Sequence, residues 1–231
     1  MIQQSKGKMF LADERGCSEM DWFRSYNTFH FGAYAREHKT PFGSLYVLND
    51  DTLAGGQYIS MVIEEDTTVL LLPVVGAITI TDSTGHSDYI EAGQCRLHTA
   101  RKTTTITIGN PFNQELVNFL QLWIKQPAAS ADTFQQKVSF DIDGQKNQLV
   151  ELSSALTENQ VFIGKFDGRA EIEYHLQHPG HGVFVFVIEG AFEVQYRLLH
   201  ARDGLGLWDT DTIELEALSN DAIILLIELP L

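Results

Sequence analysis

Two stretches of this chain repeat one pattern of alternating apolar and polar residues. Val69–Ile80 aligns with Val183–Val194, and the alignment places Gly76 and Gly190 at the same point of the pattern, 114 positions apart. In each copy an apolar run leads to a Gly-Ala pair and then to a second alternating segment. Self-similarity at a fixed offset indicates that one architecture is used twice along a chain. The sequence therefore predicts two successive domains of the same kind.

Apolar residues recur with period two over most of the chain, and amphipathic helices are scarce. Alternation of this kind predicts strands with one buried face, and turns rich in Gly and Asp separate the segments. Many short strands at such spacing are typical of a β-sandwich or a double-sheet jelly roll. We expect an all-β protein with domains at 1–127 and 128–231, joined near the small-residue segment Pro127–Ala131.

The charge balance limits the partners of such a protein. Its 31 Asp and Glu residues outnumber 16 Lys and Arg residues, which gives a formal net charge of −15. This charge repels nucleic-acid phosphates and anionic lipids, so we expect a small molecule or a protein as partner, no nucleic acid and no membrane. The N-terminus lacks a signal-peptide pattern, and Cys17 and Cys95 lie outside any CxxC motif. We therefore expect a cytoplasmic protein with reduced thiols.

Short motifs occur along the chain in a characteristic order. Those of the first half are Ala12–Gly16, Ser25–Gly32, Phe42–Leu45, Val47–Asp51, Asp82–Gly85 and Leu122–Ile124, and those of the second half are Gly206–Asp209 and Glu228–Pro230. In wording and order these motifs resemble the pirin family. The resemblance covers nearly the whole chain and implies two tandem cupin domains, a bicupin, in which each domain is a double-stranded β-helix of the jelly-roll type.

The resemblance also implies a metal site, and this chain departs from it. Active pirin-like proteins bind iron or a similar divalent metal through three His and one Glu. At the four corresponding positions this sequence has Val62, Glu64, Ile106 and Ile108. Val and Ile have no lone pairs for a metal, so at most one oxygen ligand remains where three or four are needed. We therefore predict no metal cofactor here, with Val62, Ile106 and Ile108 packed inward as core.

Neighbours of the same strand parity should face the same interior or its mouth. They are Tyr58, Ser60, Lys102 and Thr104, and with the four positions above they define a candidate non-metallic pocket. Glu64 has two interpretations. Inside the barrel its carboxyl group would have a raised pKa and could act as a general acid or base, whereas as part of a charged run beside a turn it would face water.

His175, His178 and His181 form the one histidine cluster of the sequence, close to Glu173. Histidine is the commonest metal ligand, so the cluster is an alternative metal site. Its spacing does not fit a cupin motif, however, and His178 begins a His-Pro-Gly segment that is typical of a turn. We interpret the cluster as a solvated loop, with adventitious nickel or zinc binding as the alternative.

Two classes of function remain open at this point. Loss of all four ligands favours a metal-free pirin-like bicupin that binds a small molecule or a protein partner, in a regulatory role without redox chemistry. The alternative is an enzyme, because pirin-like proteins include metal-dependent quercetin 2,3-dioxygenases, and a metal-independent cupin isomerase would use Glu64 or a histidine as base. On the first interpretation, four substitutions would recreate the metal site: Val62→His, Glu64→His, Ile106→His and Ile108→Glu.

Overall fold

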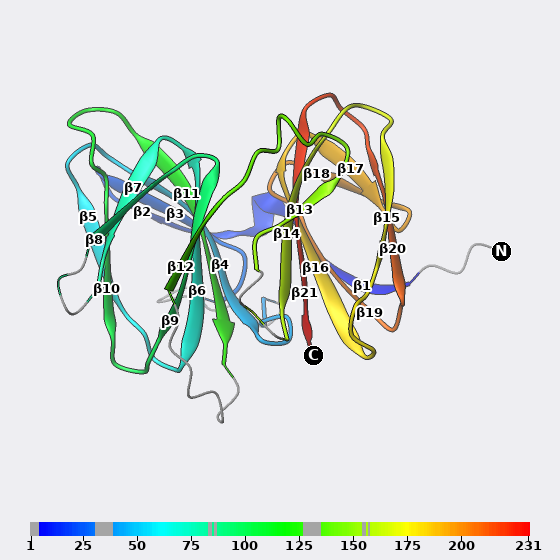
Figure 1. Ribbon diagram of the computed structural model, residues 1–231, viewed down its shortest axis with the longest axis horizontal. Coiled ribbons are helices and arrows are strands. Elements are labelled where there is room, and N and C mark those ends of the chain that lie inside the picture. The colour runs from blue at the N-terminus through cyan, green and yellow to red at the C-terminus, as the bar shows by residue number, and fades with distance from the viewer. Residues whose placement is uncertain are drawn as a thin grey trace. The chain divides into compact units, whose positions relative to one another are not determined.

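The computed structural model describes residues 5–30, 39–82, 85, 87–126, 135–153, 156 and 158–231. Over these residues the chain forms 21 strands and a single 3-10 turn of helix at Ala12–Glu14. The strands separate into two compact units (Figure 1). The N-terminal unit is Gly16–Ser139, and the C-terminal unit combines Met1–Arg15 with Phe140–Leu231. This architecture confirms the predicted all-β fold.

The N-terminal unit has two antiparallel sheets with an apolar core between them. The larger sheet contains, in spatial order, β12 (Gln135–Ser139), β9 (Gln94–Ala100), β6 (Thr67–Val75), β11 (Val117–Lys125), β4 (Leu45–Leu53), β3 (Phe23–Asn27) and β2 (Gly16–Glu19). The smaller sheet contains β5 (Tyr58–Val62), β10 (Thr105–Gly109), β7 (Ala77–Thr81) and β8 (Ser87–Glu91). Leu71, Ile78 and Phe119 are among the buried side chains that fill the core.

The C-terminal unit repeats this arrangement. Its larger sheet contains, in spatial order, β1 (Lys6–Phe10), β19 (Gly204–Trp208), β16 (His181–Glu189), β21 (Ala222–Pro230), β14 (Gln160–Phe166) and β13 (Leu149–Glu151). Its smaller sheet contains β15 (Glu171–His175), β20 (Thr212–Ala217), β17 (Ala191–Val194) and β18 (Arg197–His200). Phe166 and Phe192 pack edge to face in its core, with ring centroids 5.8 Å apart.

The strand pairings confirm the internal repeat. Gly76 joins β6 to β7 and Gly190 joins β16 to β17, with φ angles of +79° and +78°. β6 lies between β9 and β11, just as β16 lies between β19 and β21. Glycine adopts positive φ without the steric cost that a Cβ would add. The two glycines therefore occupy equivalent turns, and each turn carries the chain from the larger sheet to the smaller one.

The limits of the two units differ from the predicted boundary at residue 127. β1 pairs with β19, so the first strand of the chain belongs to the C-terminal unit. β12 pairs with β9, so the N-terminal unit extends to Ser139. The predicted seam, Pro127–Ala131, lies outside the described residues. In each unit, one edge strand thus lies outside the repeated segment of the sequence. A domain boundary that is predicted from the repeat alone does not include such a strand.

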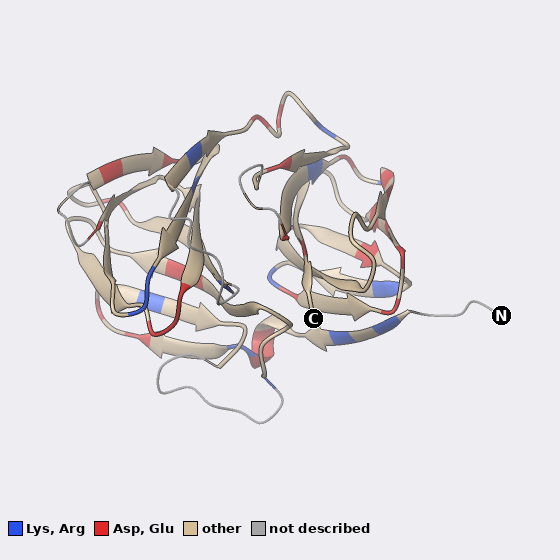
Figure 2. Cartoon of the chain, turned by 60° about the horizontal axis from the view of Figure 1, so that its bottom comes forward, with Lys and Arg blue, Asp and Glu red and all other residues tan. Residues whose placement is uncertain are grey.

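Charged residues are distributed along both units (Figure 2). Cys17 is exposed, Cys95 is buried, and both are free thiols. Among the helices of the described segments, none is long and apolar enough to cross a membrane.

Candidate functional site

The predicted metal-ligand positions do not converge on one cavity. In the pairing of β5 with β10, Val62 lies opposite Thr105 and Ile59 lies opposite Ile108. Ile59, Ile106 and Ile108 are buried in the core, whereas Val62 is 58% exposed. The prediction that Val62 packs inward is therefore wrong, while Ile106 and Ile108 are core residues as predicted. The reason is strand parity: the inward face of β5 is the one that carries Ile59.

These positions also do not fit the metal that the family resemblance implies. Glu64 is exposed just beyond β5, and it is the only one of the four with an atom able to bind a metal. Ile106 and Ile108 place hydrocarbon in the core, where the resemblance expects an imidazole and a carboxylate. These side chains therefore cannot form a three-His, one-Glu site, and the four positions do not fit that metal.

Of the other predicted pocket residues, two line a cavity and two do not. Tyr58 and Ser60 lie at the mouth of a cavity of about 320 Å³ in the N-terminal unit. Lys102 is exposed in the turn before β10, where its backbone N–H donates to the Asp66 carboxylate at 2.8 Å. The Thr104 carbonyl accepts a hydrogen bond from the Ile63 N–H at 2.8 Å, and Thr104 is absent from the cavity lining.

The cavity lies between the β2–β3–β4–β11 region of the larger sheet and β5 of the smaller sheet. We name it the β4 pocket. Its volume is within the range of roughly 300–1,000 Å³ that is usual for small-molecule sites. Its lining comprises Ser18, Met20, Trp22, Phe23, Ser25, Asn49, Asp51, Tyr58, Ile59, Ser60, Met61 and Gln121.

The floor of the β4 pocket is polar and buried. Asn49 and Asp51 alternate on β4 with Val47 and Leu53, which belong to the apolar core, so all four point to the same side of the sheet. Asn49 pairs with Gln121 on β11, and Asp51 pairs with Ser25 on β3. None of the four polar side chains is more than 3% exposed. Cross-strand register thus gathers them into one patch.

The Asp51 carboxyl group is the one strongly perturbed acid of this floor. Burial raises the pKa of Asp51 to about 7, against hydrogen bonds from Ser25 and Gln121 that lower it, and the neighbouring Asp50 raises it further. The Gln121 amide donates to Asp51, and its own oxygen accepts from the Trp123 indole N–H at 3.2 Å. Asp51 therefore changes between a hydrogen-bond donor and an acceptor near neutral pH.

Several polar atoms of the floor have no protein partner. Both side-chain atoms of the Asn49 amide and the Oδ1 atom of Asp51 make no hydrogen bond to any residue that the structure describes. Buried polar atoms are almost always paired, because leaving one unpaired costs about 1–3 kcal/mol. These atoms thus offer both a donor and acceptors to a molecule in the cavity.

The walls of the β4 pocket are apolar and aromatic. Trp22 and Phe23 lie side by side, with ring centroids 6.0 Å apart. Tyr58 and Met20 are largely exposed at the rim, and Ile59 is buried deeper in the cavity. A cavity with a polar floor and flat apolar walls suits a ligand that is apolar on its faces and polar at one edge.

Sequence reasoning missed the floor of this pocket. In the sequence, the motif Val47–Asp51 indicates a family resemblance and no binding site. The period of two along each strand could have located these residues. Asn49 and Asp51 alternate with the inward-facing Val47 and Leu53. In the same way, Gln121 lies two residues from Phe119 and two from Trp123, which both face the core.

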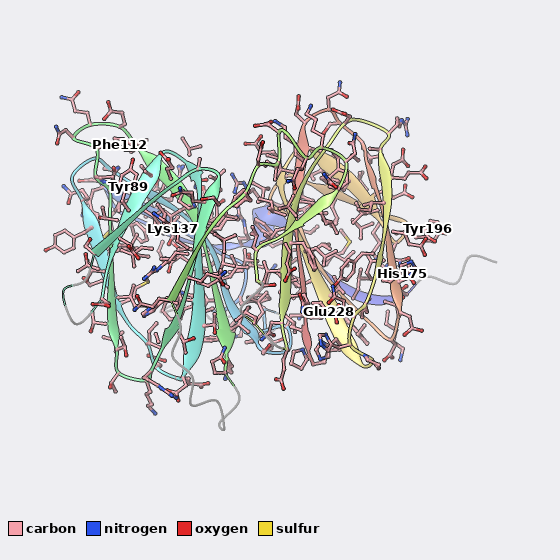
Figure 3. The ribbon with its side chains drawn as sticks, viewed as in Figure 1. Tyr89, Phe112, Lys137, His175, Tyr196 and Glu228 are labelled. Carbon is pink, nitrogen blue, oxygen red and sulfur yellow. The ribbon has the colours of Figure 1, made fainter. Side chains whose placement is uncertain are left out.

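In the C-terminal unit, two of the three clustered histidines meet a buried acid. His178 Nδ1 and His181 Nδ1 lie 3.1 Å and 3.4 Å from Glu228 Oε1. Burial and the nearby His178 lower the pKa of His181. His175 lies apart, exposed on the outer side of β15 (Figure 3), where its Nδ1 is 3.2 Å from the Thr212 hydroxyl. The predicted solvated loop is therefore only partly correct: His175 is exposed but ends strand β15, whereas His178 lies in the turn before β16 and meets a buried carboxylate.

Several known proteins are similar in sequence to this chain. Residues 156–229 match the family model of the quercetinase C-terminal cupin domain. Quercetin 2,3-dioxygenase of Escherichia coli K12 is 26% identical over 226 residues, which are 95% of this chain and 96% of that protein. A putative quercetin 2,3-dioxygenase of Pseudomonas aeruginosa is 27% identical over 92% of this chain and 95% of its own length.

Solved structures give the same result. YhhW from Escherichia coli superposes with a TM-score of 0.87 and 21% identity, over 97% of this chain and 98% of that one. A structure of the bacterial pirin YhhW in complex with nickel(II) superposes with a TM-score of 0.85 and 20% identity, over 97% and 99% of the two chains. These likenesses confirm the fold expected from the sequence.

Proposed function

We propose that this chain, which is a pirin-like bicupin, binds a planar, hydroxylated aromatic molecule in the β4 pocket without a metal at the family's ligand positions. The observation that carries the proposal is the unpartnered floor: the Asn49 amide and Asp51 Oδ1 are buried and face a cavity. A ligand that hydrogen-bonds to these atoms offsets the free-energy cost of burying them. Under this proposal, the β4 pocket is the site of the binding role expected from the sequence.

The chemistry of the lining selects the ligand class. The aromatic walls at Trp22 and Phe23 favour a flat apolar face, through stacking and burial of apolar area. The Asn49 amide pairs with a hydroxyl or carbonyl group at the edge of such a ring, and Asp51 pairs with a hydroxyl group. The cavity volume of about 320 Å³ limits the ligand to a molecule of a few fused or linked rings.

A second candidate function is metal-dependent flavonol dioxygenation, which the names of the similar proteins favour. The aromatic pocket supports flavonol binding under both proposals. The two proposals differ in whether the bound flavonol is oxidised. The family's ligand set is absent at its four positions, which are Val62, Glu64, Ile106 and Ile108. The first proposal therefore expects binding without oxygen consumption.

Substitution of Asn49 tests the first proposal with quercetin as the probe. Leu has nearly the shape of Asn but makes no hydrogen bonds, so Asn49→Leu should weaken quercetin binding about tenfold or more. Because it also removes an unpartnered buried amide, the variant should unfold at an equal or higher temperature than the parent. Quenching of tryptophan fluorescence measures binding, and thermal unfolding by circular dichroism measures stability.

A tyrosine outside the pocket serves as the control. Tyr89 on β8 is 46% exposed and does not line the cavity (Figure 3). Tyr89→Ala should leave quercetin affinity within twofold of the parent, whereas Tyr58→Ala, which removes a rim ring, should reduce it. A folded Asn49→Leu variant that binds quercetin as tightly as the parent would contradict the proposed site.

A further inference from the structure

We propose that the C-terminal unit binds one divalent transition-metal ion through His178, His181 and Glu228. This site is separate from the β4 pocket and from the N-terminal positions to which the family resemblance assigns a metal. The three side chains each offer a ligand atom, and these atoms all lie within 4.8 Å of one another. His178 lies in the turn before β16, and His181 is the first residue of that strand. Glu228 lies near the end of β21 (Figure 3).

The distances between the ligand atoms suit a shared metal ion. Glu228 Oε1 lies 3.1 Å from His178 Nδ1 and 3.4 Å from His181 Nδ1. When a metal binds its ligands at about 2.0–2.2 Å, neighbouring ligand atoms are roughly 3.0 Å apart in octahedral geometry and roughly 3.4 Å apart in tetrahedral geometry. An ion can therefore be accommodated with small side-chain rotations.

The protein already holds the carboxylate in place. Glu228 is fully buried, and its Oε2 atom accepts hydrogen bonds from the Tyr174 hydroxyl at 2.6 Å and the Gln177 N–H at 2.9 Å. The His178 N–H donates to Oε1 at 2.8 Å, which leaves that oxygen with a further lone pair. Outer hydrogen bonds of this kind orient metal-binding carboxylates in known sites.

His181 is the observation that favours a metal over an ordinary hydrogen-bond network. The network around Glu228 is complete with His178, Tyr174 and the two backbone donors. His181 adds a buried Nδ1 atom that makes no hydrogen bond to the described part of the chain, although it faces Glu228 Oε1. The two imidazole rings stack with centroids 4.7 Å apart and planes inclined by 24°. This stacking presents both Nδ1 atoms to the same oxygen.

The donor set indicates the class of metal. Two imidazole nitrogens and one carboxylate oxygen suit zinc, nickel, cobalt or ferrous iron, whereas calcium and magnesium prefer oxygen ligands. The His178 side chain is 36% exposed and that of His181 is 14% exposed, so an ion can reach the site from solvent. Three protein ligands leave at least one position for water.

Zinc titration of the untagged full-length chain, first treated with EDTA and dialysed, tests the site. Calorimetry should show saturable binding of zinc, and His178→Ala and His181→Ala should each weaken it about tenfold or more. Both side chains are partly exposed, so these variants should fold. His175→Ala is the matched control because His175 lies in the same segment with a 71% exposed side chain. Its zinc affinity should stay within twofold of the parent.

A spectroscopic readout separates coordination from an indirect effect on folding. Copper(II) bound to the parent chain should show electron paramagnetic resonance splitting from two imidazole nitrogens, and in His181→Ala from one. Zinc binding that is as tight in His181→Ala as in the parent, or no saturable zinc binding by the parent, would overturn the proposal. So would a copper spectrum that His181→Ala leaves unchanged.

Discussion

The Asp51 carboxyl group is buried on the inner face of the larger sheet, in a polar patch that the core residues Val47 and Leu53 flank on β4. Burial raises the pKa of Asp51 to about 7, well above the ordinary range of an aspartic acid. The folded chain therefore holds this proton up to about neutral pH, whereas the unfolded chain releases it near pH 4. The stability that protonated Asp51 contributes is complete below about pH 4 and is lost as the pH rises to about 7.

Asp51→Asn mimics the protonated carboxyl group and should remove this pH dependence. The difference in unfolding free energy, variant minus parent, should increase by about 1.4 kcal/mol per pH unit between about pH 4 and pH 7, and then level off. Urea unfolding at pH 5, 6, 7 and 8 measures it. A difference that does not change with pH would mean that the pKa of Asp51 is ordinary in the folded chain.

The exposed side chain of Val62 changes the expectation for the four substitutions that aim to restore a metal site. Val62→His and Glu64→His would place imidazoles in solvent, while Ile106→His and Ile108→Glu would place polar groups in the core. Burying those groups without partners should destabilise the N-terminal unit by several kcal/mol. We expect a lower melting temperature that iron or nickel does not raise. A metal-induced rise unique to this variant would show that β5 presents its other face.

Two turn glycines with positive φ differ in the space that a Cβ would have. A Cβ at Gly190 would lie 2.4 Å from Ser219 Oγ and 2.8 Å from Ala222 Cβ, in addition to the cost of φ +78°. Gly180 has a similar φ of +80°, but a Cβ there would meet nothing within 4 Å. Gly180→Ala should cost about 1 kcal/mol, and Gly190→Ala about 1–3 kcal/mol more. Chemical denaturation measures the unfolding free energy of the two variants. An equal loss in both would show that backbone strain alone, and not the close contacts at Gly190, determines the effect.

Strand identity could be predicted from sequence more reliably than strand facing. The repeat around Gly76 and Gly190 is long and regular, so period two identified the central strands correctly. In β5 both parities are partly apolar, with Tyr58 and Val62 on one face and Ile59 and Met61 on the other. Alternation alone therefore cannot determine which face of β5 is buried. The face predicted to point inward, with Tyr58 and Val62, is the exposed one.

The first strand of the chain, β1, completes the larger sheet of the C-terminal unit. Phe10 on β1 is 1% exposed and meets Phe184 edge to face, with ring centroids 5.4 Å apart. Arg197 donates a hydrogen bond to the Ser5 carbonyl at 2.6 Å. Sequence repeats cannot reveal this exchange, because β1 and β12 have no counterpart in the aligned segments and their pairing is decided by contacts distant in sequence.

Phe10→Ala should therefore destabilise the C-terminal unit by about 3–5 kcal/mol and leave the N-terminal unit unchanged. Hydrogen exchange should accelerate for amides of β16 and β19 but not for those of β4 and β11. Met9→Ala, at a 38% exposed neighbour on the same strand, is the control and should have little effect. Faster exchange in β4 and β11 instead would assign β1 to the other unit.

Binding of an aromatic ligand in the β4 pocket without a metal is the main functional proposal for this chain. Calorimetric titration of quercetin into the EDTA-treated full-length chain, with dissolved oxygen recorded in the same sample, tests it most directly. We predict saturable binding at one site, an affinity that added iron or nickel leaves unchanged, and no oxygen uptake. Binding that appears only after metal is restored, or quercetin-dependent oxygen consumption by the chain, would contradict the claim and favour a dioxygenase.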